Sequence, residues 1–183
     1  MLEKKSNIMK FTLVLPYLLT SVFAQNFSAP LVLEAYSGKW YQAYSGLFAQ
    51  KTFEKGAKCI KSFYDIGEED ILEVYNEQIA ANTKIESIRG YAYTPNFSEP
   101  RKLKVVLDGQ KEADYWIYEV GPIVDGEYQY SIVSDSFRLS LFVLVRNIND
   151  FFLEYNEKVL ESLTNMDFTR LWNAPLPTIQ DCY

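Results

Sequence analysis

The chain contains no histidine among its 183 residues, and only two cysteines. The missing histidine excludes Ser-His and Cys-His catalysis and removes the commonest zinc ligand. Glycine (8) and proline (7) are also few, no glycine-rich phosphate loop is present, and Tyr (14) and Phe (12) are abundant. This balance argues against most enzyme classes and against disorder, and it favours β-strands.

Basic residues are outnumbered as well, 18 against 24 acidic residues, for a net charge of −6. An acidic chain without a basic stripe is a poor candidate for binding nucleic acid or an anionic membrane. The length and the 48% hydrophobic content suffice for one core and are short for two. We therefore expect a single domain.

The first 24 residues have the pattern of a secretory signal peptide. Three lysines precede the uncharged run 11–24 (FTLVLPYLLTSVFA), which ends with Val22 and Ala24 at the small-residue cleavage positions. The run is too short for an ordinary membrane span, although an uncleaved anchor is an alternative. No later segment is apolar enough to span a bilayer. We expect a soluble, secreted, acidic domain of residues 25–183, starting near Gln25.

If the protein is exported, we expect the two cysteines to form a Cys59–Cys182 disulfide, because an oxidising compartment favours pairing. Such a bond closes a loop of more than a hundred residues and contributes about 4–5 kcal/mol if it is unstrained. Two sequons, at Asn26 and Asn96, are candidate glycosylation sites.

Eight β-rich or alternating runs follow one another, mostly separated by hairpin-sized turns. They are Lys39–Ser45, Cys59–Ile66, Ile71–Ile79, Lys84–Thr94, Arg101–Leu107, Ala113–Val120, Glu127–Ser134 and Arg138–Arg146.

After the last run the hydrophobic period changes to that of a helix. Asn149 is the expected N-cap of a helix from Asp150 to about Leu163. The residues on its apolar face are Phe152, Tyr155, Val159, Leu160 and Leu163.

Consecutive strands with short links suit an up-and-down antiparallel barrel, although a two-sheet sandwich also fits this pattern. The stretch SGKWYQAYSG favours the barrel: Gly38-x-Trp40 heads the first strand, and Arg146 ends the apolar stretch LFVLVRN of the last. In these features the sequence resembles the lipocalin family. The resemblance implies an all-β, eight-stranded antiparallel up-and-down barrel with one C-terminal flanking helix.

The resemblance also implies structural roles. Trp40 would close the barrel floor with Gly38 giving the backbone room, and Arg146 would pack over the tryptophan in a cation–π contact of about 0.5–2 kcal/mol. Within the family the sequence looks closest to the apolipoprotein D and bacterial lipocalin branch, in which cysteines placed like Cys59 and Cys182 pair. The family's middle motif, Thr-Asp-Tyr, is absent, since residues 118–128 read YEVGPIVDGEY.

Successive side chains of a strand point to opposite faces, so one residue of known direction sets the rest of its strand. The reference residues are an inward Trp40, an outward Cys59 and Arg146, and from them we predict which side chains face the interior. The family resemblance helps to set the third strand. Gln42 and Leu107 face inward in this scheme, and Phe48 and Phe53 of the long first loop are candidates for a lid. The residues predicted to bind ligand are Tyr44, Ile60, Ser62, Tyr64, Val74, Asn76, Gln78, Leu103, Val105, Tyr115, Ile117, Phe142 and Leu144.

Each position has a structural alternative. An inward Phe or Leu can fill a solid core, and the buried amide of Asn76 can bond to Tyr64 or to water instead of a ligand. The acidic turn Glu68-Glu69-Asp70 is expected to be a solvated tip and not a calcium site. No metal or cofactor is expected.

The lining is apolar and aromatic with a few polar groups, which is typical of a site for a small hydrophobic molecule. We expect a non-enzymatic carrier of a fatty acid, lysophospholipid, sterol or isoprenoid, with at most transient contact to a membrane or receptor through its loops. Nucleic acid binding and stable membrane insertion are not expected. Two alternatives stay open: an enzyme acting on a lipid or isoprenoid with Glu119 as its carboxylate, and a module whose loops bind a protein or glycan.

Overall fold

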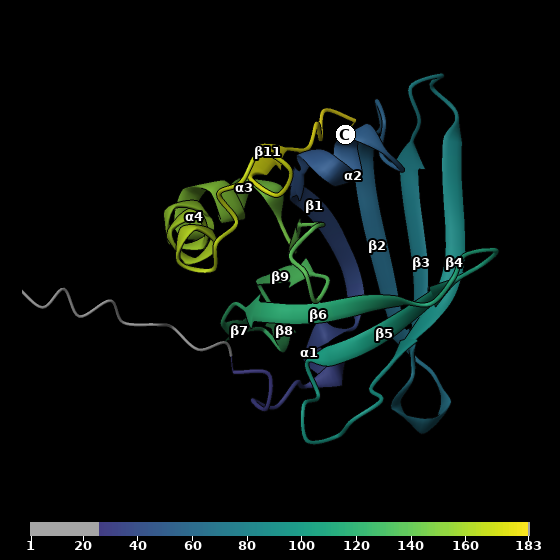
Figure 1. The fold of residues 1–183 in the computed structure, drawn as a ribbon, viewed down its shortest axis with the longest axis vertical. Helices are drawn as coiled ribbons and strands as arrows, with labels where there is room; N and C mark the ends of the chain where they lie inside the picture. Colours follow the sequence, from purple (N-terminus) through teal and green to yellow (C-terminus); the bar gives the residue numbers. More distant parts are fainter. Residues whose placement is uncertain (1–25, 183) are drawn as a thin grey trace, which may run out of the picture.

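The computed structural model describes residues 26–182, so the predicted signal peptide lies outside the described residues. These residues form a closed antiparallel barrel of eight strands with a helix packed on one side (Figure 1), which confirms the predicted fold class. The barrel strands are β1 (Gly38–Gly46), β2 (Lys58–Ile66), β3 (Leu72–Ile79), β4 (Ile85–Tyr93), β5 (Lys102–Leu107), β6 (Ala113–Val120), β9 (Tyr130–Ser134) and β10 (Phe142–Val145).

The barrel closes where β1 pairs with β10, from Tyr41 opposite Val145 to Ser45 opposite Phe142. A β-bulge interrupts this pairing between Gln42 and Tyr44. Because a bulge adds one residue to one strand, it reverses the inside-outside alternation beyond it.

The last two predicted strands differ from the observed ones. The run 127–134 is divided into β8 (Glu127–Tyr128), which pairs with β7 (Ile123–Val124) in a separate hairpin, and β9. The run 138–146 contributes only β10, because Asp135 draws the preceding segment into a loop: its carboxylate accepts hydrogen bonds from the backbone N–H groups of residues 137, 139 and 140. In the tail, β11 (Pro175–Pro177) pairs with β1.

The helical segment after β10 consists of α3 (Ile148–Asp150), a π-helical turn η2 (Phe151–Tyr155) and α4 (Asn156–Asn165). The predicted N-cap was wrong by two residues, since Asn147 Oδ1 accepts hydrogen bonds from the N–H groups of residues 149 and 150. The π-turn also changes the register of the apolar face. As a result Phe151 is buried, whereas the predicted Phe152 is 45% exposed.

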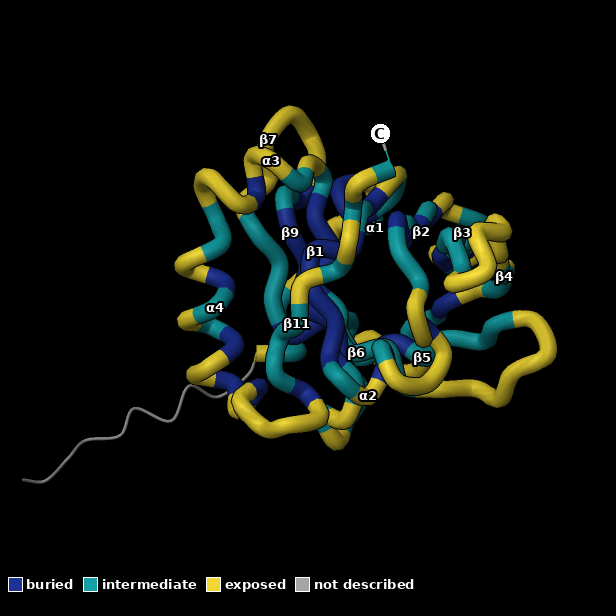
Figure 2. The backbone as a smooth tube through the Cα atoms, turned by 90° about the horizontal axis from the view of Figure 1, so that it is seen from above, coloured by how far each residue is buried: buried dark blue, intermediate teal, exposed yellow. Residues whose placement is uncertain are grey.

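The core has two parts, one between the barrel wall and α4 and one inside the closed end of the barrel. Figure 2 shows buried positions along the side of α4 that faces the barrel and exposed positions on its outer side. Three short helices complete the fold: α1 (Leu33–Tyr36), α2 (Leu47–Lys51) and η1 (Glu68–Asp70). Within residues 26–182 no helix has the length and apolarity needed to cross a bilayer.

A disulfide joins Cys59 of β2 to Cys182, with the two Cα atoms 6.1 Å apart. Figure 1 shows the C-terminal end lying beside β2, as this bond requires. The bond ties the tail, with β11, to the open end of the barrel.

Candidate ligand cavity

The closed end of the barrel is built around Trp40, which is fully buried at the start of β1. Its indole Nε1 donates a hydrogen bond to the Tyr36 carbonyl at 2.8 Å, and the Arg146 guanidinium lies 3.8 Å from the indole ring centroid. Gly38 has φ +93°, and a Cβ atom there would lie 3.2 Å from Arg146 Nη1. The motif residues therefore pack as a structural unit beneath the cavity.

A layer of tyrosines covers this unit and forms the bottom of the cavity. The Tyr115 hydroxyl lies 2.8 Å from the Tyr36 hydroxyl and 2.9 Å from the Tyr64 hydroxyl, and Tyr36 also bonds to Ser131. Burial raises the pKa of all three phenols above the ordinary value. They stay neutral, so the bottom of the cavity is polar but uncharged.

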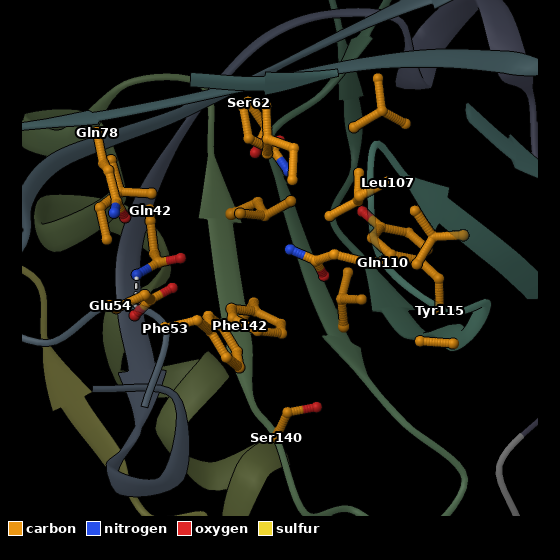
Figure 3. Close-up of a pocket in the computed structure, with 18 of the residues that line it drawn as sticks. Gln42, Phe53, Glu54, Ser62, Gln78, Leu107, Gln110, Tyr115, Ser140 and Phe142 are labelled. Atoms are coloured by element: carbon orange, nitrogen blue, oxygen red, sulfur yellow. Dashed lines mark hydrogen bonds between the residues drawn. The ribbon is translucent and has the colours of Figure 1, made fainter. Parts of the chain in front are cut away.

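Above the tyrosines the barrel encloses a cavity of about 710 Å³. Figure 3 shows Gln42, Glu54 and Gln78 on one side of it, with Leu107 and Tyr115 on the other. Ten of the residues predicted to bind ligand line this cavity: Ile60, Ser62, Tyr64, Val74, Asn76, Gln78, Val105, Tyr115, Phe142 and Leu144.

Tyr44 does not line the cavity, and its predicted inward orientation was wrong. The bulge that follows Gln42 reverses the alternation, so Gln42 lines the cavity and the Tyr44 side chain points out toward the helical segment. There its hydroxyl donates to Asn156 Oδ1 at 2.7 Å, and its ring lies edge-on to Phe151.

Leu103 and Ile117 also do not line the cavity, although they share the inward face of their strands with Val105 and Tyr115. Both belong to the buried cluster at the closed end, together with Tyr36 and Trp40. The interior is thus filled at their level and open only above it. Ala35 and Tyr36 of this cluster come from α1, a single helical turn that the sequence pattern did not reveal.

Two aromatic side chains of the segment between β1 and β2 lie over the cavity, where a lid was predicted. The Phe53 ring centroid lies 6.1 Å from that of Phe142 and 6.4 Å from that of Phe48. Phe53 is 55% exposed and Phe48 36% exposed, although both line the cavity. Aromatic contacts therefore cover this side of the cavity.

Sequence reasoning missed Glu54, which lines the cavity beside Phe53 (Figure 3). Glu54 is only 7% exposed, and its Oε2 accepts hydrogen bonds from Ser45 Oγ at 2.8 Å and from Gln42 Nε2 at 3.1 Å. Burial raises the pKa of this carboxyl, and the two hydrogen bonds oppose that effect. A lone glutamate in a long loop gave no periodic signal by which it could have been found.

Asn76 supplies a second polar group. Its Oδ1 is buried in the cavity wall, and within residues 26–182 it has no hydrogen-bond partner. Neither Tyr64 nor any other described residue satisfies it. An orphaned buried acceptor is costly, so a donor on a bound molecule would be favoured there.

The other candidates lie away from the cavity. The Glu119 carboxylate accepts a hydrogen bond from the Tyr130 hydroxyl at 2.7 Å and is not among the cavity-lining residues. The acidic turn 68–70 is exposed, as are the sequon residues Asn26 and Asn96. The geometry therefore provides a binding chamber, and Glu119 is not part of its wall.

Comparison with known proteins agrees with this architecture. The model of the family described as Lipocalin-like domain matches residues 31–169. Apolipoprotein D from Macaca fascicularis is 33% identical over 120 residues, which cover 61% of this chain and 59% of the relative. The chain thus spans about 60% of the length of that curated relative.

Two solved structures show a similar fold. Apocrustacyanin C2 superposes with a TM-score of 0.58 at 21% identity, covering 82% of this chain and 80% of the other. Japanin from Rhipicephalus appendiculatus, solved bound to cholesterol, gives a TM-score of 0.53 at 19% identity, covering 83% of this chain and 98% of the other. With the family match over residues 31–169 and the closed eight-stranded barrel, these likenesses show that the chain belongs to the lipocalin family, close to apolipoprotein D.

Proposed function

We propose that this protein is a secreted carrier that binds one small hydrophobic molecule inside the barrel. The observation that carries the proposal is the cavity of about 710 Å³ above a filled floor. Its volume falls within the range of about 300–1,000 Å³ that is usual for small-molecule sites. A sterol, an isoprenoid or a single-chain lipid is of suitable size.

The lining supports a ligand that is mostly apolar and has one or two polar groups. Val74, Val105, Phe142 and Leu144 supply apolar wall, and burying ligand surface against them contributes about 25 cal/mol per Å². The unpartnered Asn76 Oδ1 would orient a donor group. Export rests on the predicted signal peptide and agrees with the Cys59–Cys182 disulfide, because such bonds persist outside the cytosol.

The test is a fluorescence titration with a neutral apolar probe, N-phenyl-1-naphthylamine. Phe142 lines the cavity, so Phe142→Asp should weaken binding by at least about ten-fold, because the ligand would face a desolvated charge. Phe137→Asp is the matched control: Phe137 is 89% exposed and does not line the cavity. Equal affinities of wild type and a folded Phe142→Asp variant would contradict the carrier proposal, as would absence of probe binding by wild type.

A further inference from the structure

The cavity wall is acidic. Its charged members are five carboxylates and one lysine. Two of the carboxylates form ion pairs: Asp114 with Lys104 at 2.7 Å, and Glu77 with Lys61 at 3.3 Å. The lysine in the wall, Lys111, is exposed. A ligand carboxylate entering this cavity would therefore meet mostly like charge, which costs free energy in a partly desolvated site.

Glu54 is the carboxylate that distinguishes this wall. It is the only buried acidic residue in the described part of the chain. No lysine or arginine of residues 26–182 forms an ion pair with it, and its two hydrogen-bond donors, Ser45 and Gln42, are neutral. A buried charge without a counter-charge is unfavourable unless something pairs with it.

The position of Glu54 makes it accessible from inside the cavity. It belongs to the segment between α2 and β2, beside Phe53, and Figure 3 shows its side chain at the cavity on the side opposite Tyr115. Both of its side-chain hydrogen bonds use Oε2, which leaves Oε1 for a ligand. Leu107, a residue of the apolar wall, lies across the cavity from this carboxylate (Figure 3).

We propose that the ligand is a cationic amphiphile whose ammonium group pairs with Glu54 while its apolar chain fills the barrel toward Tyr115. The inference rests on the carrier function proposed above and specifies its ligand class. A charge-assisted hydrogen bond of this kind is stronger than a neutral one. The ligand supplies the counter-charge that the fold does not provide.

The experiment compares three ligands with the same chain, n-decylamine, n-decanol and n-decanoate, by displacement of N-phenyl-1-naphthylamine at pH 8. At that pH the amine is cationic, because alkylammonium groups resemble lysine with a pKa of about 10.4. We expect decylamine to bind at least about ten-fold more tightly than decanol, and decanoate more weakly than either. Glu54→Gln should abolish the preference for the amine, so that the ratio of the decylamine and decanol affinities falls to about one.

Glu86→Gln is the matched control, since Glu86 also lines the cavity but is exposed and accepts a hydrogen bond from Gln78. If Glu86→Gln lowers the amine preference as much as Glu54→Gln does, the preference comes from the summed negative charge of the cavity wall. The assignment to Glu54 would then be wrong. Equal binding of all three ligands by wild type would overturn the cationic ligand and leave the carrier function standing. Failure of all three to displace a bound probe would likewise contradict the inference alone, whereas failure of the probe itself to bind contradicts the carrier function.

Discussion

Arg146 stacks on Trp40 at 3.8 Å while its guanidinium donates to four backbone carbonyls. The acceptors belong to residues 35, 37, 39 and 128, so one side chain joins α1, the start of β1 and β8. The planar guanidinium of arginine can donate to all four carbonyls while it stacks on the indole ring. The ammonium group of lysine has only three donors and no flat surface that could stack on the ring. The floor on which the cavity stands thus depends on the geometry of arginine and not only on its charge.

Arg146→Lys should therefore lower the free energy of unfolding by about 2–4 kcal/mol, because the stacking and at least one buried hydrogen bond are lost. Urea denaturation measures the change. Arg89→Lys is the control, since Arg89 stacks on Tyr75 at 4.5 Å but is exposed, and we expect less than about 1 kcal/mol there. Equal stabilities of the two variants would mean that the backbone hydrogen bonds of Arg146 contribute little.

The Cys59–Cys182 disulfide spans 123 residues and should contribute up to about 4–5 kcal/mol through the unfolded state. We expect the Cys59→Ala/Cys182→Ala double variant to melt at a clearly lower temperature than wild type and to match reduced wild type. Calorimetry with and without a reducing agent makes this comparison. A free thiol detected by mass mapping of the native protein would show that the bond is not formed.

Tyr44 should matter for stability and not for ligand binding. Tyr44→Phe removes the hydrogen bond to Asn156 and should cost about 1 kcal/mol, with unchanged affinity for the neutral probe. Tyr64→Phe is the variant for comparison, because the Tyr64 hydroxyl bonds to Tyr115 at the bottom of the cavity and its loss should affect probe binding more. If Tyr44→Phe alters probe affinity more than Tyr64→Phe does, Tyr44 would have to face the interior after all.

Strand alternation placed ten of the thirteen predicted ligand-binding residues correctly in the cavity wall, because side-chain direction is a local property of a strand. It failed at Tyr44, since a bulge is set by the pairing of β1 with β10 and leaves no periodic mark. It also could not tell filled levels from open ones. Leu103 faces inward as predicted but lies in the buried cluster with Tyr36 of α1 and Trp40, an arrangement that depends on contacts distant in sequence.

Glu54 could not be predicted as a cavity residue for the same reason, that its position depends on contacts distant in sequence. Its role depends on a loop that folds back against β1, where Ser45 and Gln42 meet the carboxylate. Residue type alone favours a solvated surface position for a glutamate in such a loop. Only the three-dimensional arrangement makes this residue the buried charge of the cavity.

Glu54→Gln should stabilise the empty protein at neutral pH while it removes the preference for cationic ligands. The pKa of this carboxyl is raised by burial, so the folded state holds its proton to higher pH than the unfolded state does. The unfolding free energy therefore falls as pH rises from the unfolded pKa through the folded pKa, and the ionised side chain destabilises the fold above that window. Glutamine has no charge to desolvate, and its Oε1 can accept both hydrogen bonds that reach Glu54 Oε2.

We expect a melting temperature about 2–4 °C higher at pH 8, which corresponds to about 1 kcal/mol, and a smaller difference at pH 4, where the wild-type carboxyl is protonated. Thermal melts of wild type and Glu54→Gln at both pH values measure this, with Glu86→Gln as the exposed control. A Glu54→Gln variant less stable than wild type at pH 8 would mean that the carboxylate is held by its neighbours as a structural charge. Higher stability together with a lost amine preference would show that the fold maintains an unfavourable charge at the position where a cationic ligand is bound.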